Sequence, residues 1–290
     1  GLLVLGFAGI ILAGALLLLL PWCQNKGAVA FVETLFTSTS AVCVTGLIVV
    51  DTPTAFTVGG QAVIVMLIQI GGLGIMTFAA LAFILLGRRL SLASQAALHD
   101  SFFQRDLGVE FRKRFSQIIT ITSVIEATGA LLLFLALTQR EENPLQALFS
   151  AVFHSVSAFC NAGFYVYTDN LVGLRSSPTV MIVIMLLIIL GGLGHMVIFE
   201  LWDRFKGALS GKPSRKAPAQ LSVHNRLVLR VTGVLLFTGW VGLLILGQTP
   251  GETTWGSKVS CALFKSVTAR TEGFNTVDIG RMTNGTILVM

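Results

Sequence analysis

Charged side chains are scarce in this chain. Lys, Arg, Asp and Glu make up 12% of its 290 residues, whereas soluble domains carry about 25%. Tyr and His are also few, with two and four copies. Long uncharged runs raise the mean hydropathy to +0.82. This composition excludes an ordinary soluble domain and predicts an integral membrane protein embedded in lipid.

Paired cysteines and enzyme motifs are also missing from the sequence. The four cysteines form no C-x-x-C pair and have no His at metal-binding spacing, which favours small buried side chains. The sequence contains no H-E-x-x-H zinc motif, no G-x-S-x-G elbow, no nucleotide-binding loop and no nucleic-acid motif. We therefore expect neither an enzyme nor a cofactor in this chain, and no nucleic-acid partner.

Five apolar runs are long enough to cross a membrane as helices, which takes roughly 20 residues. They occupy residues 2–20, 61–86, 115–137, 179–201 and 227–246. A sixth begins near residue 286. The first run lacks the basic start and the cleavage site of a signal peptide, so we interpret it as a true span.

Three shorter stretches lie between these runs, at residues 28–40, 145–158 and 258–268. They are too short to span and fit re-entrant half-helices. A glycine segment follows each, with spacings of 117 and 110 residues between the glycines, which indicates an internal repeat. The three segments are Cys43-Val44-Thr45-Gly46-Leu47, Cys160-Asn161-Ala162-Gly163-Phe164 and Arg270-Thr271-Glu272-Gly273-Phe274.

The repeat predicts an all-α polytopic membrane protein built from units of helix, re-entrant pore helix and helix. Unit one takes residues 1–90 and unit two residues 112–205, while residues 226–290 form an incomplete third unit. A fourth unit is absent from this sequence. The linkers 91–111 and 206–225 are expected in the cytoplasm, because 13 of the 20 Lys and Arg residues fall in these linkers or at the adjoining ends of the units.

A second motif, Gly-Gly-Leu-Gly, occurs at residues 71–74 and 191–194. Small residues allow close helix packing in lipid. We therefore expect these glycines to let the second spans crowd round the half-helices.

The glycine segments can perform ion chemistry. Backbone carbonyls facing an axis replace the hydration shell of a cation, and the C-terminal end of a helix dipole favours a cation. Glycine supplies positive φ and close approach. Asn143 and Pro144 fit the N-cap and first position of the second half-helix. Hydroxyls expected to bond neighbouring backbone are those of Thr37, Ser38, Thr39, Ser155, Ser157 and Thr268.

Several charged or titratable residues lie at membrane depth. Glu126 has two equally weighted interpretations, a functional carboxylate and a partnered structural one. Glu272 and Arg270 are expected to form a local ion pair. His195 is interpreted as a packing residue, and Glu33 as a charge that complements the start of its helix.

At these residues the chain resembles the Trk/Ktr/HKT superfamily of potassium transporters, and within it the KtrB-type uptake membrane subunits. The resemblance covers nearly the whole chain. The similar runs read TSAVCVTGLIVVDT, IQIGGLGIMTF, SAFCNAGF, LGGLGHMVIFELW and SVTARTEGFNTVDIG.

The resemblance implies four units round a pseudo-fourfold pore, and a homodimer in the cell membrane gated by a cytoplasmic nucleotide-binding subunit of KtrA or KtrC type. It also implies K⁺ uptake, stimulated by Na⁺. Transport of another cation or solute, or a non-transporting membrane scaffold, stays open as an alternative. The implied K⁺ filter is the backbone of Val44, Thr45, Gly46, Asn161, Ala162, Gly163, Thr271, Glu272 and Gly273.

Overall fold

The computed structural model of the protein describes residues 2–25, 29–74, 109–141, 143–209, 221–246, 255–269 and 273–276. Within these ranges, regular secondary structure is helical throughout, apart from one isolated bridge between Gln24 and Phe56. The all-α prediction is therefore confirmed. Most of both predicted linkers, the end of the second span and the run beginning near residue 286 lie outside the described residues.

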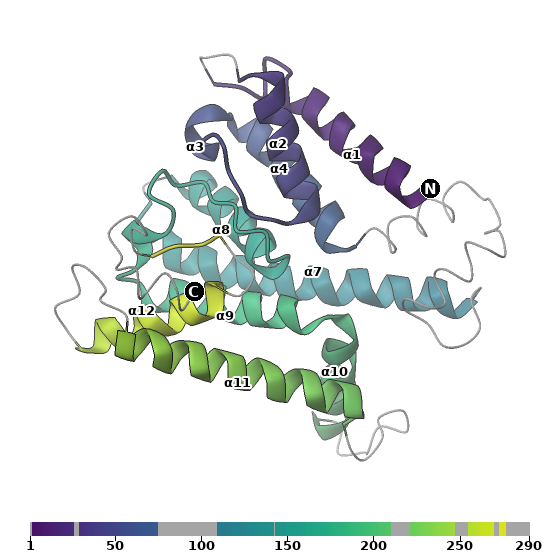
Figure 1. The fold of residues 1–290 in the computed structure, drawn as a ribbon, viewed down its shortest axis with the longest axis vertical. Coiled ribbons are helices and arrows are strands. Elements are labelled where there is room, and N and C mark those ends of the chain that lie inside the picture. The colour runs from purple at the N-terminus through teal and green to yellow at the C-terminus, as the bar shows by residue number, and fades with distance from the viewer. Residues whose placement is uncertain are drawn as a thin grey trace.

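The first unit contains α1 (Leu2–Leu18), α2 (Phe31–Cys43), the short α3 (Thr52–Ala55) and α4 (Val58–Gly72). Helix α2 packs against both α1 and α4, so it lies between the two outer helices of its unit (Figure 1). This is the arrangement expected of a half-helix enclosed by two spans.

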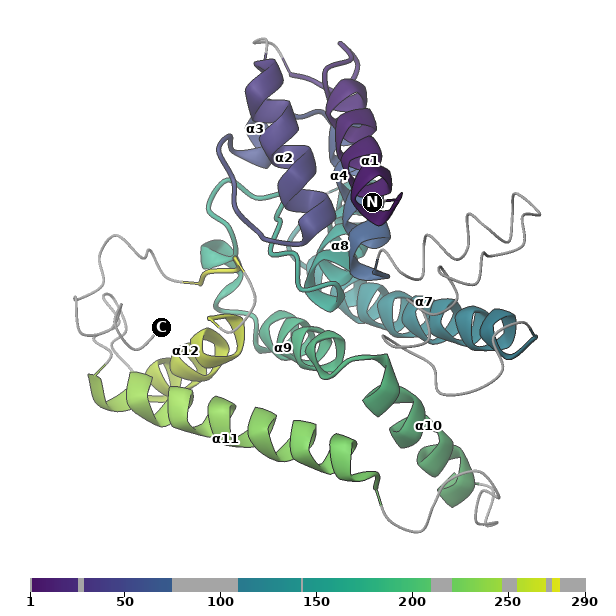
Figure 2. The ribbon, with the colours of Figure 1, turned by 45° about the vertical axis from the view of Figure 1, so that its right-hand side comes forward.

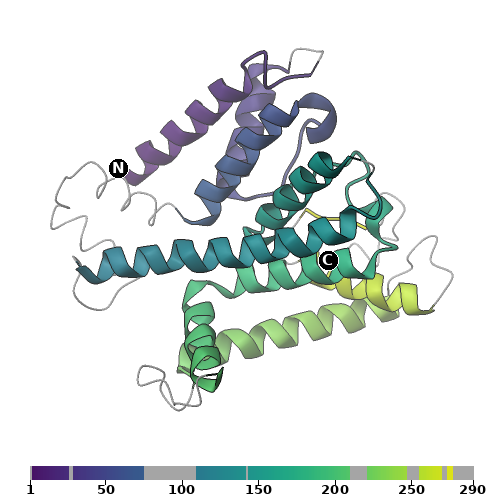
Figure 3. The same ribbon diagram turned by 180° about the vertical axis from the view of Figure 1, so that it is seen from behind.

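The second unit repeats this order, with α7 (Val109–Leu137), α8 (Pro144–Phe159), the short helix η1 (Val172–Leu174), α9 (Pro178–Leu193) and α10 (His195–Leu209). Helix α8 packs on both α7 and α9. Seen from behind, α7 runs between the first unit and α9 (Figure 3). The repeated packing confirms the predicted unit of outer helix, half-helix and outer helix.

The third unit contributes α11 (Val223–Leu246) and α12 (Trp255–Thr268), which pack on each other. Helix α12 also packs on α9, and α4 packs on α8. The units therefore meet through their half-helices and second outer helices. This places the C-terminal ends of α2, α8 and α12 towards one region of the molecule (Figure 1).

The sequence placed the half-helices correctly but misjudged their ends. The first was expected at 28–40 and lies three residues later, because Glu33 caps its start by accepting a 2.8 Å hydrogen bond from the Ala30 N–H. The third begins at Trp255 rather than at residue 258. The second begins as predicted: Asn143 Oδ1 accepts a 3.0 Å hydrogen bond from the Leu145 N–H, and Pro144 opens the helix.

The predicted span 179–201 does not form one straight helix. It is broken into α9 and α10, which are bent by 110° (Figure 2). The break falls at Gly194, whose φ is +79°. Gly74 has a φ of +80°, and α4 ends just before it at Gly72. The last glycine of each Gly-Gly-Leu-Gly motif therefore leaves helical geometry, a role the sequence did not suggest.

Two described helices, α7 and α11, contain 23-residue segments long and apolar enough to cross a membrane. The bent pair of α9 and α10 makes a third if it is one broken span, and α1 and α4 include shorter apolar helices. The apolar surface is also turned outward. Side chains such as Val4, Leu145 and Val234 are largely exposed, as expected for helices that face lipid.

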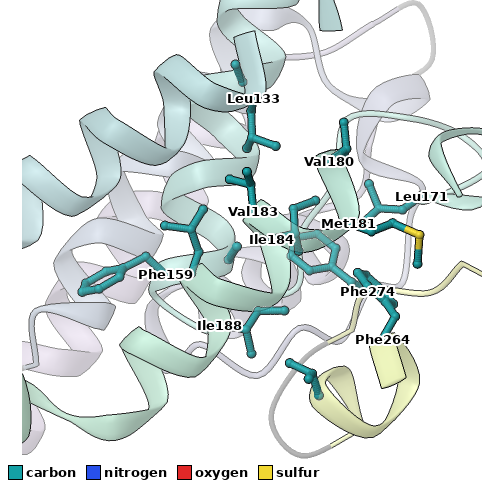
Figure 4. Packing of buried hydrophobic residues seen from close by; sticks show 14 of the residues in the cluster. Leu133, Phe159, Leu171, Val180, Met181, Val183, Ile184, Ile188, Phe264 and Phe274 are labelled. Carbon is teal, nitrogen blue, oxygen red and sulfur yellow. The ribbon is translucent and has the colours of Figure 1, made fainter. Parts of the chain in front are cut away.

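Buried apolar side chains join the second and third units. One core cluster includes Leu133 of α7, Ile184 of α9 and Phe264 of α12, each at most 1% exposed. Phe274 of the third glycine segment is fully buried in the same cluster (Figure 4). The third loop is therefore anchored in the core of the second unit.

Candidate functional site: the three glycine loops

The three glycine segments converge. A Cβ added to Gly46 would lie 2.8 Å from the Ala162 carbonyl oxygen of the second loop. A Cβ added to Gly273 would lie 2.9 Å from the Gly46 oxygen and 3.1 Å from the Gly163 oxygen. The loops therefore touch backbone to backbone, at positions separated by more than 100 residues in sequence, with no side chain between these glycines.

The first two loops leave their helices through the same backbone turn. After α2, the Val44 N–H donates to the Ala41 carbonyl and the Thr45 N–H to the Ser40 carbonyl, at 3.3 and 3.0 Å. This pair of hydrogen bonds defines a Schellman ending. Val44 consequently has a φ of +55°, which is uncommon for a β-branched residue.

The ending of α8 matches it residue for residue. The Asn161 N–H donates to the Ala158 carbonyl and the Ala162 N–H to the Ser157 carbonyl, at 3.1 and 2.8 Å. Asn161 has a φ of +59° and Gly163 a φ of +67°, close to the +70° of Gly46. The two loops thus share a backbone path although their side chains differ. The Asn after α8 was a usable sequence signal for this turn, whereas the Val after α2 gave none.

Hydroxyl groups stabilise the buried backbone around the loops, as the sequence predicted. The Ser157 hydroxyl donates to the Phe164 carbonyl at 2.8 Å, on the far side of Gly163. In the first loop, the Thr45 hydroxyl instead donates to the Ser40 hydroxyl at 2.9 Å. Thr37, Thr39 and Thr268 donate to carbonyls of their own helices.

The same serine hydrogen bond, from a half-helix to the preceding outer helix, occurs in all three units. Ser38, Ser155 and Ser266 of the half-helices donate to carbonyls of the preceding outer helices, at 2.7, 2.7 and 2.8 Å. The accepting carbonyls belong to Ile11, Glu126 and Leu236.

A glycine lies three residues after each accepting carbonyl. A Cβ at Gly14, Gly129 or Gly239 would lie 2.4 to 2.7 Å from the serine oxygen. Each half-helix is therefore held against the preceding outer helix by a serine that hydrogen-bonds to its backbone and packs against one of its glycines. Two of these serines, Ser38 and Ser155, were predicted to bond backbone, whereas their shared contact with a glycine was not predicted.

Replacing Ser155 with Ala is expected to destabilise the protein modestly. Ser155 is fully buried, and the substitution leaves the Glu126 carbonyl without this 2.7 Å hydrogen bond. Hydrogen bonds between helices in membranes contribute about 0.6 kcal/mol on average. We expect a small fall in the melting temperature of the detergent-solubilised protein. Thr128→Ala is the control, because the Thr128 hydroxyl is exposed and bonds within α7. An equal fall in melting temperature in both variants would show that the hydrogen bond from Ser155 to the Glu126 carbonyl does not stabilise the protein.

The Gly-Gly pairs of the repeated motif permit close helix contact, as predicted. A Cβ on Gly71 would lie 2.2 Å from the Val42 carbonyl oxygen of α2, and a Cβ on Gly191 would lie 1.8 Å from the Phe159 carbonyl oxygen of α8. Both contacts fall on the last turn of a half-helix, immediately before its glycine loop. The second outer helices thus press on the helix ends from which the loops emerge.

The ends of α2, α8 and α12 also determine the electrostatics of the region. Each half-helix directs its C-terminal end, which carries partial negative charge, towards the loops. Among the described loop residues 44–46, 161–163 and 273, none is charged. Backbone carbonyls and helix dipoles therefore favour a cation here and require no metal-binding side chains.

The remaining predicted residues have mixed outcomes. Glu126 is buried, and the Cys160 thiol donates to its carboxylate at 3.8 Å, which supports the partnered interpretation. Thr271, Glu272 and Arg270 lie outside the described residues, as does the side chain of His195. Lys265 was not among the predicted residues; it is a buried cation on α12, and its ammonium donates to Asn275 Oδ1.

Comparison with known proteins gives consistent matches. The family model for TrkH cation transport proteins matches residues 12–290. The Ktr system potassium uptake proteins B of Vibrio alginolyticus and Bacillus subtilis are each 38% identical over 99% of this chain. The potassium/sodium uptake protein NtpJ of Enterococcus hirae is 33% identical over 98% of it. The chain spans only 61–62% of the length of these relatives.

A solved structure has the same fold. The potassium transporter TrkH from Vibrio parahaemolyticus superposes with a TM-score of 0.62 at 20% sequence identity. The match covers 94% of this chain and 51% of that protein. The arrangement of outer helices and half-helices is therefore that of a known membrane transporter fold.

Proposed function

Because the chain belongs to the TrkH cation transport protein family, we propose that the full-length protein carries K⁺ across a cell membrane through a filter of backbone carbonyls. This family is one of transporters rather than enzymes. The observation that carries the proposal is the convergence of Gly46, Gly163 and Gly273 at the C-terminal ends of three half-helices. Uncharged carbonyls at such a place can replace the hydration shell of a potassium ion.

The proposed filter consists of the three loop backbones, at residues 44–46, 161–163 and 271–273. The first three loops touch each other directly. A pseudo-fourfold arrangement of these carbonyls round one axis requires a fourth loop. We propose that the full-length protein supplies it, since the curated relatives are longer than this chain.

The proposed assembly is a homodimer with a cytoplasmic nucleotide-binding subunit of KtrA or KtrC type, and uptake is stimulated by Na⁺. The "Ktr system" names of the relatives support a multi-subunit transporter. The proposed location is the cell membrane. The excess of Lys and Arg in and beside the linkers supports placing both linkers on its cytoplasmic side.

Growth of a host that lacks its own potassium uptake systems tests the function. The full-length protein, expressed with its regulatory subunit, is expected to restore growth on micromolar K⁺. Growth at high K⁺ and the amount of protein in the membrane serve as controls. A protein that reaches the membrane but restores no growth would contradict the proposal and favour a scaffold. Uptake of another solute without Rb⁺ or K⁺ would favour a different transporter.

A further inference from the structure

The loop that follows the second filter segment reaches across to the third one. Asn170 lies in this loop, and its amide Nδ2 donates to the Gly273 carbonyl at 3.1 Å. Its Oδ1 accepts from the Asn275 N–H at 3.2 Å, and the Leu171 N–H donates to the Asn275 carbonyl at 3.1 Å. Three hydrogen bonds therefore hold residues 273–275 against a loop more than 100 residues earlier in the chain.

The loop that carries Asn170 is itself anchored. The Tyr167 hydroxyl donates to the Glu141 carboxylate just beyond the end of α7. The Tyr167 ring stacks on the buried His154 ring of α8, with centroids 5.1 Å apart and planes 11° apart. Burial, with the Glu141 hydrogen bond, raises the pKa of Tyr167, so the phenol stays protonated and keeps donating. The contacts of Tyr167 therefore hold in place the loop from which the Asn170 side chain extends.

The third segment is also held from its other side. The Lys265 ammonium of α12 donates to the Asn275 side chain, and Lys265 is only 6% exposed. Phe274, between the two bonded residues, is fully buried in the core. Residues 273–275 are thus clamped between the outer loop of unit two and the half-helix of unit three.

We propose that Asn170 is a positioning residue for ion selectivity, which orients the Gly273 carbonyl across the boundary between units two and three. The inference rests on the proposed function, since it assumes that this carbonyl belongs to the filter. An amide donor fixes the direction of a carbonyl and takes up one of its two lone pairs. Removing the amide therefore changes how the carbonyl presents itself to an ion.

A backbone role of Asn170 has to be separated from its amide role. Asn170 has a φ of +60°, a conformation that Asn and Gly adopt more readily than other residues. Asn170→Gly keeps this backbone conformation and removes the amide. Asn170→Asp keeps an acceptor for the Asn275 N–H but cannot donate to the Gly273 carbonyl. Thr168→Ala, at an exposed position in the same loop, is the matched control.

The experiment measures Rb⁺ uptake in competition with Na⁺ in the full-length transporter. We expect Asn170→Gly and Asn170→Asp both to lower the preference for Rb⁺ over Na⁺ about fivefold, as loss of one hydrogen bond of typical strength would. Thr168→Ala should keep the wild-type preference. A merely structural role would lower the amount of protein and the maximal rate but leave the ion preference unchanged.

A wild-type ion preference in Asn170→Gly would overturn the inference, because the backbone conformation alone would then suffice. A wild-type preference in Asn170→Asp would overturn the role of the donor to Gly273. Both comparisons require that the wild-type protein takes up Rb⁺. Failure of the proposed function is recognised separately, since the wild-type protein itself would then take up no Rb⁺.

Discussion

Gly46→Ser in the full-length protein is expected to lower the preference for K⁺ over Na⁺ by roughly tenfold, which corresponds to about 1.4 kcal/mol. Gly46 has a φ of +70°, and a Cβ there would lie 2.8 Å from the Ala162 carbonyl oxygen. A left-handed conformation costs a residue with a side chain roughly 1–2 kcal/mol. The loop must therefore relax, and the carbonyls of two neighbouring loops move with it.

Gly163→Ser should have a similar effect, since Gly163 has a φ of +67° in an equivalent loop. Competition uptake of Rb⁺ and Na⁺ measures the change. Gly233→Ser in α11 is a suitable control, because a Cβ there meets no atom within 4 Å. An unchanged ion preference in the Gly46 and Gly163 variants would contradict their assignment to the proposed filter.

Gly191→Ala is expected to prevent stable folding of unit two or to lower its melting temperature strongly. The new Cβ would lie 1.8 Å from the Phe159 carbonyl oxygen, which is backbone and cannot rotate away. Overpacking of this kind typically costs about 1–3 kcal/mol, occasionally more. The backbone of α8 or α9 must therefore shift, which would disturb the turn at Asn161.

The Gly191 prediction is tested by thermal unfolding of the detergent-solubilised protein, together with its yield in the membrane. Gly233→Ala provides the matched control, because it makes the same substitution inside a helix with open space around it. Ala is the better helix former, so this control should unfold at the wild-type temperature or above it. A Gly191→Ala protein with wild-type yield and melting temperature would show that the helices are not in close contact.

Much of the fold could be predicted from apolar run lengths and from the repeated glycine segments. Run length distinguishes a spanning helix from a half-helix, because a helix needs about 20 residues to cross the hydrocarbon core of a typical bilayer. The bend at Gly194 escaped prediction because the apolar composition continues through it, and only the backbone conformation of one glycine ends α9. The cap formed by Glu33 likewise depends on which N–H group its carboxylate reaches, which composition does not show.

The site was predicted at the level of its glycines and not at the level of the contacts that hold them. The turn at Val44 uses a residue with low preference for positive φ, so tertiary contacts override the local preference there. The link from Asn170 to Gly273 joins residues 103 positions apart. No local pattern encodes such a pair. Lys265 was missed for the same reason, because its role becomes clear only from its burial and its contact with Asn275.

The direct backbone contact between the glycine loops limits how the proposed filter can be redesigned. Where Gly46, Gly163 and Gly273 meet, no side chain remains that a substitution could shorten. A substitution at these positions can only add atoms, so it acts on the proposed filter by displacing the loop backbones. Admitting a larger ion would instead require a greater distance between the half-helices. That distance depends on the contacts of their serines with Gly14, Gly129 and Gly239.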